Sequence, residues 1–287
     1  MGRAQDERSV MRSDAWTLQG PISSTLREAR EASEPRAWPS DRDLSSVVGL
    51  GAPLSARSGS RRATAPLAGK KLAFSGDSIT FGYDEDREGA RMADPWVDQV
   101  GRMLGAEACV NYGVSSATLI DGPDSTHGIL RAFPAYDDDI DVIGFLIGIN
   151  DSYFGHPLGK PDDGDATTYC GGLNLLCRGA VEKWRPADGK LVFLMTYPKN
   201  DQPHSRREDV RFAGLTGWDA WNEAIRHVAR RYSLPVCDLH AELGVCPETD
   251  PRYEYWYRRA NCHSPHPTQA CANVIARFVA AWIRARV

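Results

Sequence analysis

Short apolar segments alternate with segments of helical periodicity from Lys70 to the C-terminus. The clearest apolar segment is 142–148, where nearly every residue is apolar, as expected for a central parallel strand that is covered on both faces. Four further segments of this kind predict strands: 71–77, 108–113, 191–196 and 234–239. Strands that alternate with helices favour a parallel sheet between two helical layers. We therefore predict an α/β protein with a three-layer α/β/α fold and a mostly parallel sheet of about five strands.

Three segments have the apolar spacing of an amphipathic helix. The first begins at Asp94 and Pro95, an N-cap residue followed by proline at the first helical position, and it ends at Gly105. The second has its apolar stripe at Trp218, Trp221, Ile225, Val228 and Tyr232. The third begins at Pro267, and its predicted core face consists of Cys271, Val274, Ile275, Phe278, Val279, Trp282 and Ile283.

The first 66 residues differ in composition from the rest of the chain. They contain ten arginines, no lysine and eight acidic residues, and their apolar residues show little periodicity. A segment of this composition buries too little apolar surface to offset the entropy that folding costs. We predict an N-terminal arm that is largely disordered over 1–66 and a single folded domain over 67–287.

The charge balance narrows the set of expected partners. The chain of 287 residues has 34 basic and 38 acidic residues, a net charge of −4. It therefore has no global basic excess with which to bind nucleic acid or an anionic membrane surface. No apolar run approaches the roughly 20 residues of a membrane-spanning helix. We expect a small-molecule substrate, no nucleic acid and no membrane span, and the sequence leaves the oligomeric state open.

The cysteines bear on the cellular compartment. Seven cysteines are an odd number for a fully paired secreted protein, although three pairs lie close in sequence: Cys170/Cys177, Cys237/Cys246 and Cys262/Cys271. A domain of this size needs no covalent crosslinks to hold its core, so we prefer thiols in a reducing compartment. The residues after Met1 are charged and polar rather than apolar. We expect a cytoplasmic location.

Polar residues with chemical potential follow the predicted strands. Ligands of open α/β sheets bind beyond the carboxyl ends of the strands. Ser78 follows the first strand in a Gly-Asp-Ser turn, Gly113 ends the second strand, and Asn150 follows the third. His266 precedes the last helix. A serine, a histidine and N–H donors at one sheet edge are the components of acyl transfer: a nucleophile, a general base and an oxyanion hole.

These motifs resemble those of the SGNH, or GDSL, hydrolase superfamily, whose fold is flavodoxin-like. The resemblance extends from about Leu72 to the C-terminus, with matches at 76–78, around Gly113, at 148–151 and at 266–267. It implies that Ser78 is the nucleophile and an oxyanion donor through its N–H. It also implies that Gly113 and Asn150 donate to the oxyanion, that His266 is the general base, and that no cofactor is needed.

One position departs from the pattern of this superfamily. The aspartate that usually stands three residues before the histidine is replaced by His263. In a serine protease triad, replacing that acid by an amide costs roughly 10⁴ in rate. A backbone carbonyl can orient an imidazole instead, and the carboxylate of Asp238, Asp250 or Glu254 could also reach His266. The sequence leaves these alternatives open.

The resulting prediction is a serine esterase that hydrolyses O-acyl or O-acetyl esters through an acyl-enzyme, with a small-molecule ester or an acylated sugar as substrate. Two alternatives remain: an acyltransferase on the same scaffold, and a non-catalytic binding protein on a decayed hydrolase fold, which the His263 substitution motivates. Cys262, His263 and His266 have no second cluster at the spacing of a zinc site, so we predict no metal.

Overall fold

The computed structural model describes residues 66–87, 90–122, 125, 127–200, 209–246, 249–250, 256–257 and 265–287. The predicted arm over 1–66 lies outside the described residues, apart from Pro66. His263 and Glu254 also lie outside them. The described residues belong to the compact unit 61–287.

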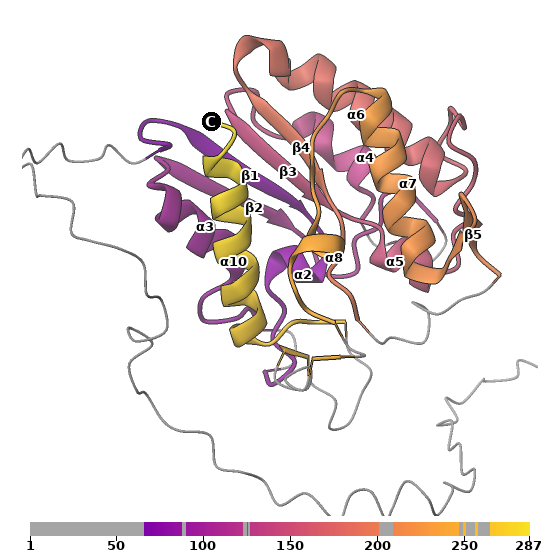
Figure 1. The fold of residues 1–287 in the computed structure, drawn as a ribbon. Helices are drawn as coiled ribbons and strands as arrows, with labels where there is room; N and C mark the ends of the chain where they lie inside the picture. The colour runs from indigo at the N-terminus through magenta and orange to yellow at the C-terminus, as the bar shows by residue number, and fades with distance from the viewer. Residues whose placement is uncertain are drawn as a thin grey trace, which may run out of the picture. The chain divides into compact units, whose positions relative to one another are not determined.

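A five-stranded parallel sheet forms the centre of this unit (Figure 1). Its strands are β1 (Lys71–Gly76), β2 (Ala108–Gly113), β3 (Val142–Leu146), β4 (Leu191–Met195) and β7 (Val236–Cys237). They lie in the order β2-β1-β3-β4-β7, and each neighbouring pair is parallel. All five residues of the central strand β3 are buried, because helices cover both of its faces. The predicted fold class is confirmed.

Helices form a layer on each face of the sheet (Figure 1). On one face, α3 (Trp96–Leu104) packs against α10 (Gln269–Arg284), and on the other α6 (Tyr169–Trp184) packs against α7 (Gly217–Arg231). The shorter elements are α2 (Ser78–Phe81), α4 (Ile129–Ala132), η2 (Phe133–Ala135), α5 (Ile149–Tyr153), η3 (Pro186–Asp188), β5 (Arg211–Phe212), β6 (Leu215–Thr216) and α8 (Leu239–Glu242). No helix in these described segments combines the length and apolarity required to cross a bilayer.

Two helix starts differ from the prediction by one or two residues. The N-cap of α3 is Pro95 rather than Asp94, because the Asp94 carboxylate pairs with Arg102 at 2.5 Å instead of capping the helix. The last helix begins at Gln269 rather than Pro267, and the Thr268 hydroxyl caps it by accepting the Cys271 N–H at 3.3 Å. His266 therefore lies in the segment that leads into α10.

Helix α6 and the β5–β6 hairpin were not predicted from the sequence. Ten of the sixteen residues of α6 are buried, so the helix lacks a polar face wide enough to reveal an amphipathic pattern. Its glycines also weaken any prediction from helix propensity. The hairpin strands have only two residues each, which is too short for an alternating pattern to be recognised.

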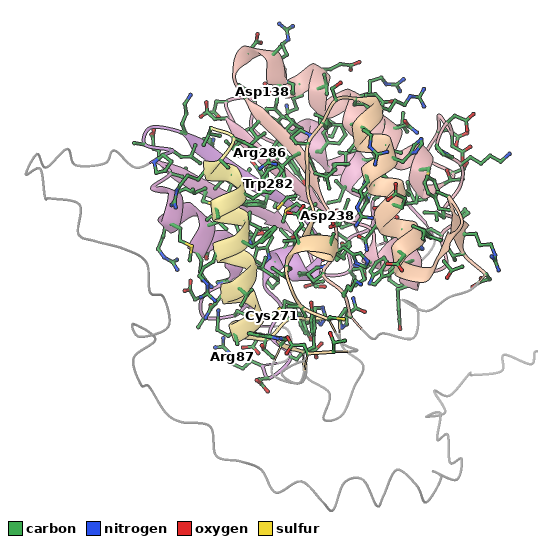
Figure 2. All side chains as sticks on the ribbon, viewed as in Figure 1. Arg87, Asp138, Asp238, Cys271, Trp282 and Arg286 are labelled. Atoms are coloured by element: carbon green, nitrogen blue, oxygen red, sulfur yellow. The ribbon has the colours of Figure 1, made fainter. Side chains whose placement is uncertain are left out.

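Five of the cysteines that the structure describes are buried or half-buried thiols. Cys109, Cys170, Cys177, Cys237 and Cys271 are free, so none of the three pairs that are close in sequence forms a disulfide. Burial raises the pKa of Cys170, Cys177 and Cys271 to about 12, which makes these thiols poor nucleophiles. Cys271 lies at the start of α10 (Figure 2). Near the other end of this helix, the Arg286 guanidinium carbon lies 3.7 Å from the centroid of the Trp282 ring. The thiols of Cys170, Cys177, Cys237 and Cys271 are part of the hydrophobic core.

Candidate active site

The turn after β1 brings a short helix onto the ends of two strands. Gly76 and Gly113 are register partners at the carboxyl ends of β1 and β2. A Cβ atom on Gly76 would lie 2.2 Å from the Leu146 carbonyl oxygen, and one on Gly113 would lie 2.2 Å from the Phe81 backbone nitrogen. Only glycine permits such close approach of backbones. These two positions therefore allow α2 to lie directly against the sheet edge.

Ser78 is the first residue of α2. The Asp77 side chain caps the helix by accepting the Ile79 N–H at 2.9 Å, and the first N–H groups of a helix have no partner within the helix. The Ser78 side chain is largely buried, with 7% of the residue exposed. Ser78 thus carries both a hydroxyl and an N–H at a helix N-terminus at the sheet edge.

The Ser78 hydroxyl lies against the imidazole of His266. The distance from Ser78 Oγ to His266 Nε2 is 2.7 Å, within the range for proton transfer to a general base. Burial lowers the pKa of His266 below its ordinary value, although a neighbouring carboxylate opposes this effect. A lowered pKa keeps the imidazole neutral near pH 7, and therefore able to accept a proton. The two residues are 188 positions apart in sequence, and the structure brings them together.

That neighbouring carboxylate is Glu85, which the sequence analysis did not identify. Glu85 Oε1 is hydrogen-bonded to His266 Nδ1, on the side of the ring opposite Ser78. Glu85 lies in the loop between α2 and α3, within the acidic run 84–86. This acidic run was the sequence feature that could have pointed to Glu85. It was not decisive, because most runs of charged residues are simply solvated.

Asn150 lies at the start of α5, directly after β3. Its Nδ2 donates to the Ala117 carbonyl oxygen at 2.8 Å, in the loop that follows β2. The next residue, Asp151, accepts the N–H groups of Leu119 and Ile120 at 2.8 and 3.2 Å. Asn150 and Asp151 therefore hold the β2 loop against α5. An asparagine amide has two N–H donors, and the bond to Ala117 orients the group that carries both.

The Gly113 N–H, which the resemblance implies as an oxyanion donor, already has an acceptor within the chain. It donates to the Asn111 Oδ1 atom at 2.8 Å. The turn that follows has Ser116 at a φ of +62°, and its Val114 and Ala117 N–H groups donate to Gly76 and Val114 carbonyl oxygens. Among the residues that the structure describes, the N–H groups of Ser115 and Ser116 donate to no backbone carbonyl oxygen.

Of the three carboxylates considered from the sequence, the structure describes Asp238 and Asp250, and both accept hydrogen bonds from residues other than His266. Asp238 lies at the N-terminus of α8 (Figure 2), where it accepts from Arg226 Nε and the Thr196 hydroxyl, each at 2.7 Å. These contacts lower its pKa in spite of partial burial. Asp250 accepts the Trp256 Nε1–H at 2.8 Å. Glu254 and His263 lie outside the described residues, so the structure does not describe either position.

Comparison with solved structures supports the fold. A Lactobacillus plantarum protein is 22% identical over 77% of this chain and 99% of its own, with a TM-score of 0.62. The Mycobacterium smegmatis aryl esterase is 21% identical over 76% and 100%, with a TM-score of 0.53. The Enterococcus faecalis lipase/acylhydrolase is 22% identical over 76% and 96%, with a TM-score of 0.52. No curated protein matches the chain.

The family assignment rests on the sequence itself. The pattern of the GDSL-like Lipase/Acylhydrolase family matches residues 74–272, a span that includes Ser78, Asn150 and His266. The chain belongs to this family, which confirms the resemblance found in its motifs. It is a hydrolase that acts on ester bonds.

Proposed function

We propose that the protein is a serine esterase that hydrolyses carboxylic O-acyl esters through an acyl-enzyme formed on Ser78. The observation that carries the proposal is the 2.7 Å contact between Ser78 Oγ and His266 Nε2. A serine hydroxyl is a weak nucleophile until a base within hydrogen-bond distance accepts its proton. The lowered pKa of His266 suits it to that role near neutral pH.

The reaction proceeds in two halves. Ser78 Oγ attacks the carbonyl carbon while His266 Nε2 takes the hydroxyl proton, and the bond to the alcohol oxygen breaks as the imidazolium returns that proton to it. Water then attacks the acyl carbon and gives its proton to Nε2. The bond to Ser78 Oγ breaks, the carboxylic acid leaves, and the proton passes back to Ser78.

The negative oxygen of each tetrahedral intermediate needs hydrogen-bond donors. The Ser78 N–H at the start of α2 and the Asn150 amide supply two of them. We propose that the third comes from the turn at 114–117, through the Ser115 or Ser116 N–H, in place of Gly113, whose N–H already donates to Asn111. Asn150 contacts this turn at Ala117, so one rigid unit presents both donors.

Small or sugar-borne acyl esters are the proposed substrates. Tyr153, which is 67% exposed, follows Asn150 by three residues and packs edge-on to Phe154 at 5.5 Å between ring centroids. Exposed aromatic rings beside a reactive centre can stack on the apolar face of a sugar or line an acyl pocket. We also propose a cytoplasmic location, which is in keeping with the odd number of cysteines.

A fluorophosphonate label and an ester panel test this proposal. We expect the label to modify Ser78, and nitrophenyl esters to be hydrolysed faster when the acyl chain is short. Acetylated sugars assayed beside them show whether the alcohol part contributes to recognition. The Ser78→Ala variant is the control: it should lose labelling and hydrolysis while its stability changes by no more than about 1 kcal/mol. Absence of labelling in a folded wild-type protein would favour a binding protein instead.

A further inference from the structure

We propose that Glu85 is the positioning carboxylate for His266, in place of the aspartate that the superfamily usually has three residues before the histidine. This inference rests on the proposed function of Ser78 and His266. The geometry that carries it is the alignment of the Ser78, His266 and Glu85 side chains. Ser78 Oγ lies 2.7 Å from His266 Nε2, and Glu85 Oε1 is hydrogen-bonded to Nδ1 on the other side of the ring. Glu85 and His266 come from segments 181 residues apart.

The contact with Glu85 determines which nitrogen of His266 carries the proton. A carboxylate can only accept a hydrogen bond, so Nδ1 must be protonated to donate to Glu85. In the neutral imidazole, Nε2 then has the free lone pair. That lone pair faces the Ser78 hydroxyl, which is the arrangement that proton transfer from Ser78 requires. Glu85 therefore selects the reactive tautomer.

Glu85 also stabilises the charge that forms during the reaction. Its negative charge raises the pKa of His266, against the larger effect of burial, which lowers it. The side chains of Glu85 and His266 are only 26% and 16% exposed, so solvent weakens the attraction less than at a fully exposed site. When Nε2 takes the Ser78 proton, the imidazolium is held between Ser78 and a carboxylate.

The loop that contains Glu85 is anchored at both ends. Tyr83 forms an antiparallel bridge with Arg91, and the Met92 N–H donates to the Gly82 carbonyl oxygen at 2.7 Å. Arg91 donates to the Phe81 carbonyl oxygen at 2.9 Å and pairs with Asp98 of α3 at 2.8 Å. Such contacts limit the positions that the Glu85 backbone can adopt.

The same loop also supports the imidazole ring itself. The Tyr83 ring lies over the His266 ring, with 4.6 Å between centroids and 35° between planes. Tyr83 therefore restricts rotation of the ring, while Glu85 holds its Nδ1 edge. Both contacts come from residues five and seven positions after Ser78. A triad is defined by geometry rather than by the order of its residues, so a carboxylate from this loop can replace one near the histidine.

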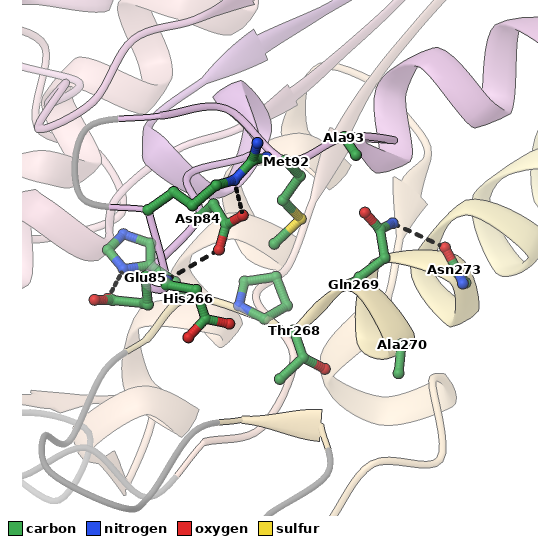
Figure 3. Close-up of a pocket in the computed structure, with 12 residues that line it drawn as sticks. Asp84, Glu85, Met92, Ala93, His266, Thr268, Gln269, Ala270 and Asn273 are labelled. Carbon is green, nitrogen blue, oxygen red and sulfur yellow. Dashed lines mark hydrogen bonds and ion pairs between the residues drawn. The ribbon is translucent and has the colours of Figure 1, made fainter.

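Glu85 is accessible to small molecules from one side. Glu85 and His266 meet at one end of a cavity of about 720 Å³ (Figure 3). The charged or titratable groups that line this cavity are Glu85, His266, Asp84, Asp86 and Arg87. Arg87 Nε lies 3.0 Å from Asp84 Oδ2, so the positive charge of Arg87 is paired with the Asp84 carboxylate. A small carboxylate such as formate can therefore enter beside His266 when the Glu85 side chain is removed.

The test compares Glu85→Gln with Asp86→Asn, which removes the same charge from the next residue of the loop. We expect Glu85→Gln to lower kcat by about 10²- to 10⁴-fold, the upper figure being the usual cost of amidating a triad acid, with little change in KM. Without the charge of Glu85, the pKa of His266 falls further. The acidic limb of the pH–rate profile should therefore move to lower pH. Asp86→Asn should leave kcat within a few-fold of the wild type.

Two further variants separate positioning from folding. Glu85→Asp keeps the charge and should retain more activity than Glu85→Gln. Formate should raise the activity of Glu85→Ala but not that of the wild type. Unchanged kcat and pH limb in Glu85→Gln would overturn the inference, as would equal losses in Asp86→Asn or the absence of rescue by formate. If the wild type itself neither hydrolyses esters nor takes a fluorophosphonate on Ser78, the proposed function fails instead.

Discussion

Replacing Asp77 with asparagine tests the effect of a buried charge beside the nucleophile on stability. Asp77 is fully buried, with Ile79 N–H and the Tyr197 hydroxyl as donors to its two oxygens. Burial raises its pKa from the ordinary value of 3.8 to about 7, and these hydrogen bonds oppose the shift only in part. Asparagine has the same shape, keeps a capping oxygen, and can donate to the Tyr197 oxygen.

The sign of the effect follows from proton binding. Between pH 4 and pH 7 the folded chain keeps the Asp77 proton while the unfolded chain loses it, so the free energy of unfolding falls as pH rises. At about 1.4 kcal/mol per pKa unit, the loss reaches about 4 kcal/mol once the pH exceeds 7. The amide escapes this loss, but its bond to Tyr197 is weaker than one to a charged oxygen. We expect Asp77→Asn to stabilise the protein by about 2–4 kcal/mol at pH 8, and by less than about 1 kcal/mol at pH 4.

Urea unfolding at pH 4 and pH 8 measures this difference directly. Asp162→Asn serves as the control, because Asp162 is exposed and its replacement should change stability by no more than about 0.5 kcal/mol at either pH. The decisive quantity is the difference between the two pH values, in which any strain caused by the amide cancels. Equal effects of Asp77→Asn at pH 4 and pH 8, or a larger gain at pH 4, would refute the reasoning.

Three further predictions follow from the site and its supports. Asn150→Ala should lower kcat by roughly 10²–10³ while KM stays nearly unchanged; steady-state kinetics check this, and a rise in KM alone would make Asn150 a binding residue. Trp96→Ala should cost about 3–5 kcal/mol in urea unfolding, because the buried Trp96 indole supports α2 through a 2.9 Å bond to the Ile79 carbonyl oxygen, and a cost below 1 kcal/mol would contradict that role. The His263→Asp variant should have a kcat/KM equal to or above the wild-type value, and the same substitution should restore activity to Glu85→Gln. A large loss of kcat/KM in the folded single variant would give His263 a role of its own.

The strands and the convergence of their ends could be predicted because both are local properties. The apolar run at 142–148 gives a buried central strand whatever surrounds it, and parallel strands must end at one edge. Ser78 and Asn150 come after neighbouring parallel strands, so the sequence alone indicated that both would lie at that edge. His266 could be added because it precedes the helix that ends the chain.

Glu85 could not be predicted for a physical reason. Its position depends on the path of the loop between α2 and α3. The ion pair between Arg91 and Asp98 helps to determine that path, and no local sequence pattern reveals this contact. The same holds for the Gly113 N–H, whose acceptor depends on the rotamer of Asn111. Side-chain reach and rotamer choice are tertiary properties, whereas strand and helix patterns are local ones.

The most direct test of the proposed mechanism is detection of the acyl-enzyme. A reaction with p-nitrophenyl acetate is quenched with acid during turnover, and peptide mass spectrometry locates the acetyl group. The proposed mechanism predicts an acetyl group on the Ser78 hydroxyl, which is absent from Ser78→Ala. Turnover that proceeds with no acetyl group on Ser78, or with the group on another residue, would contradict it.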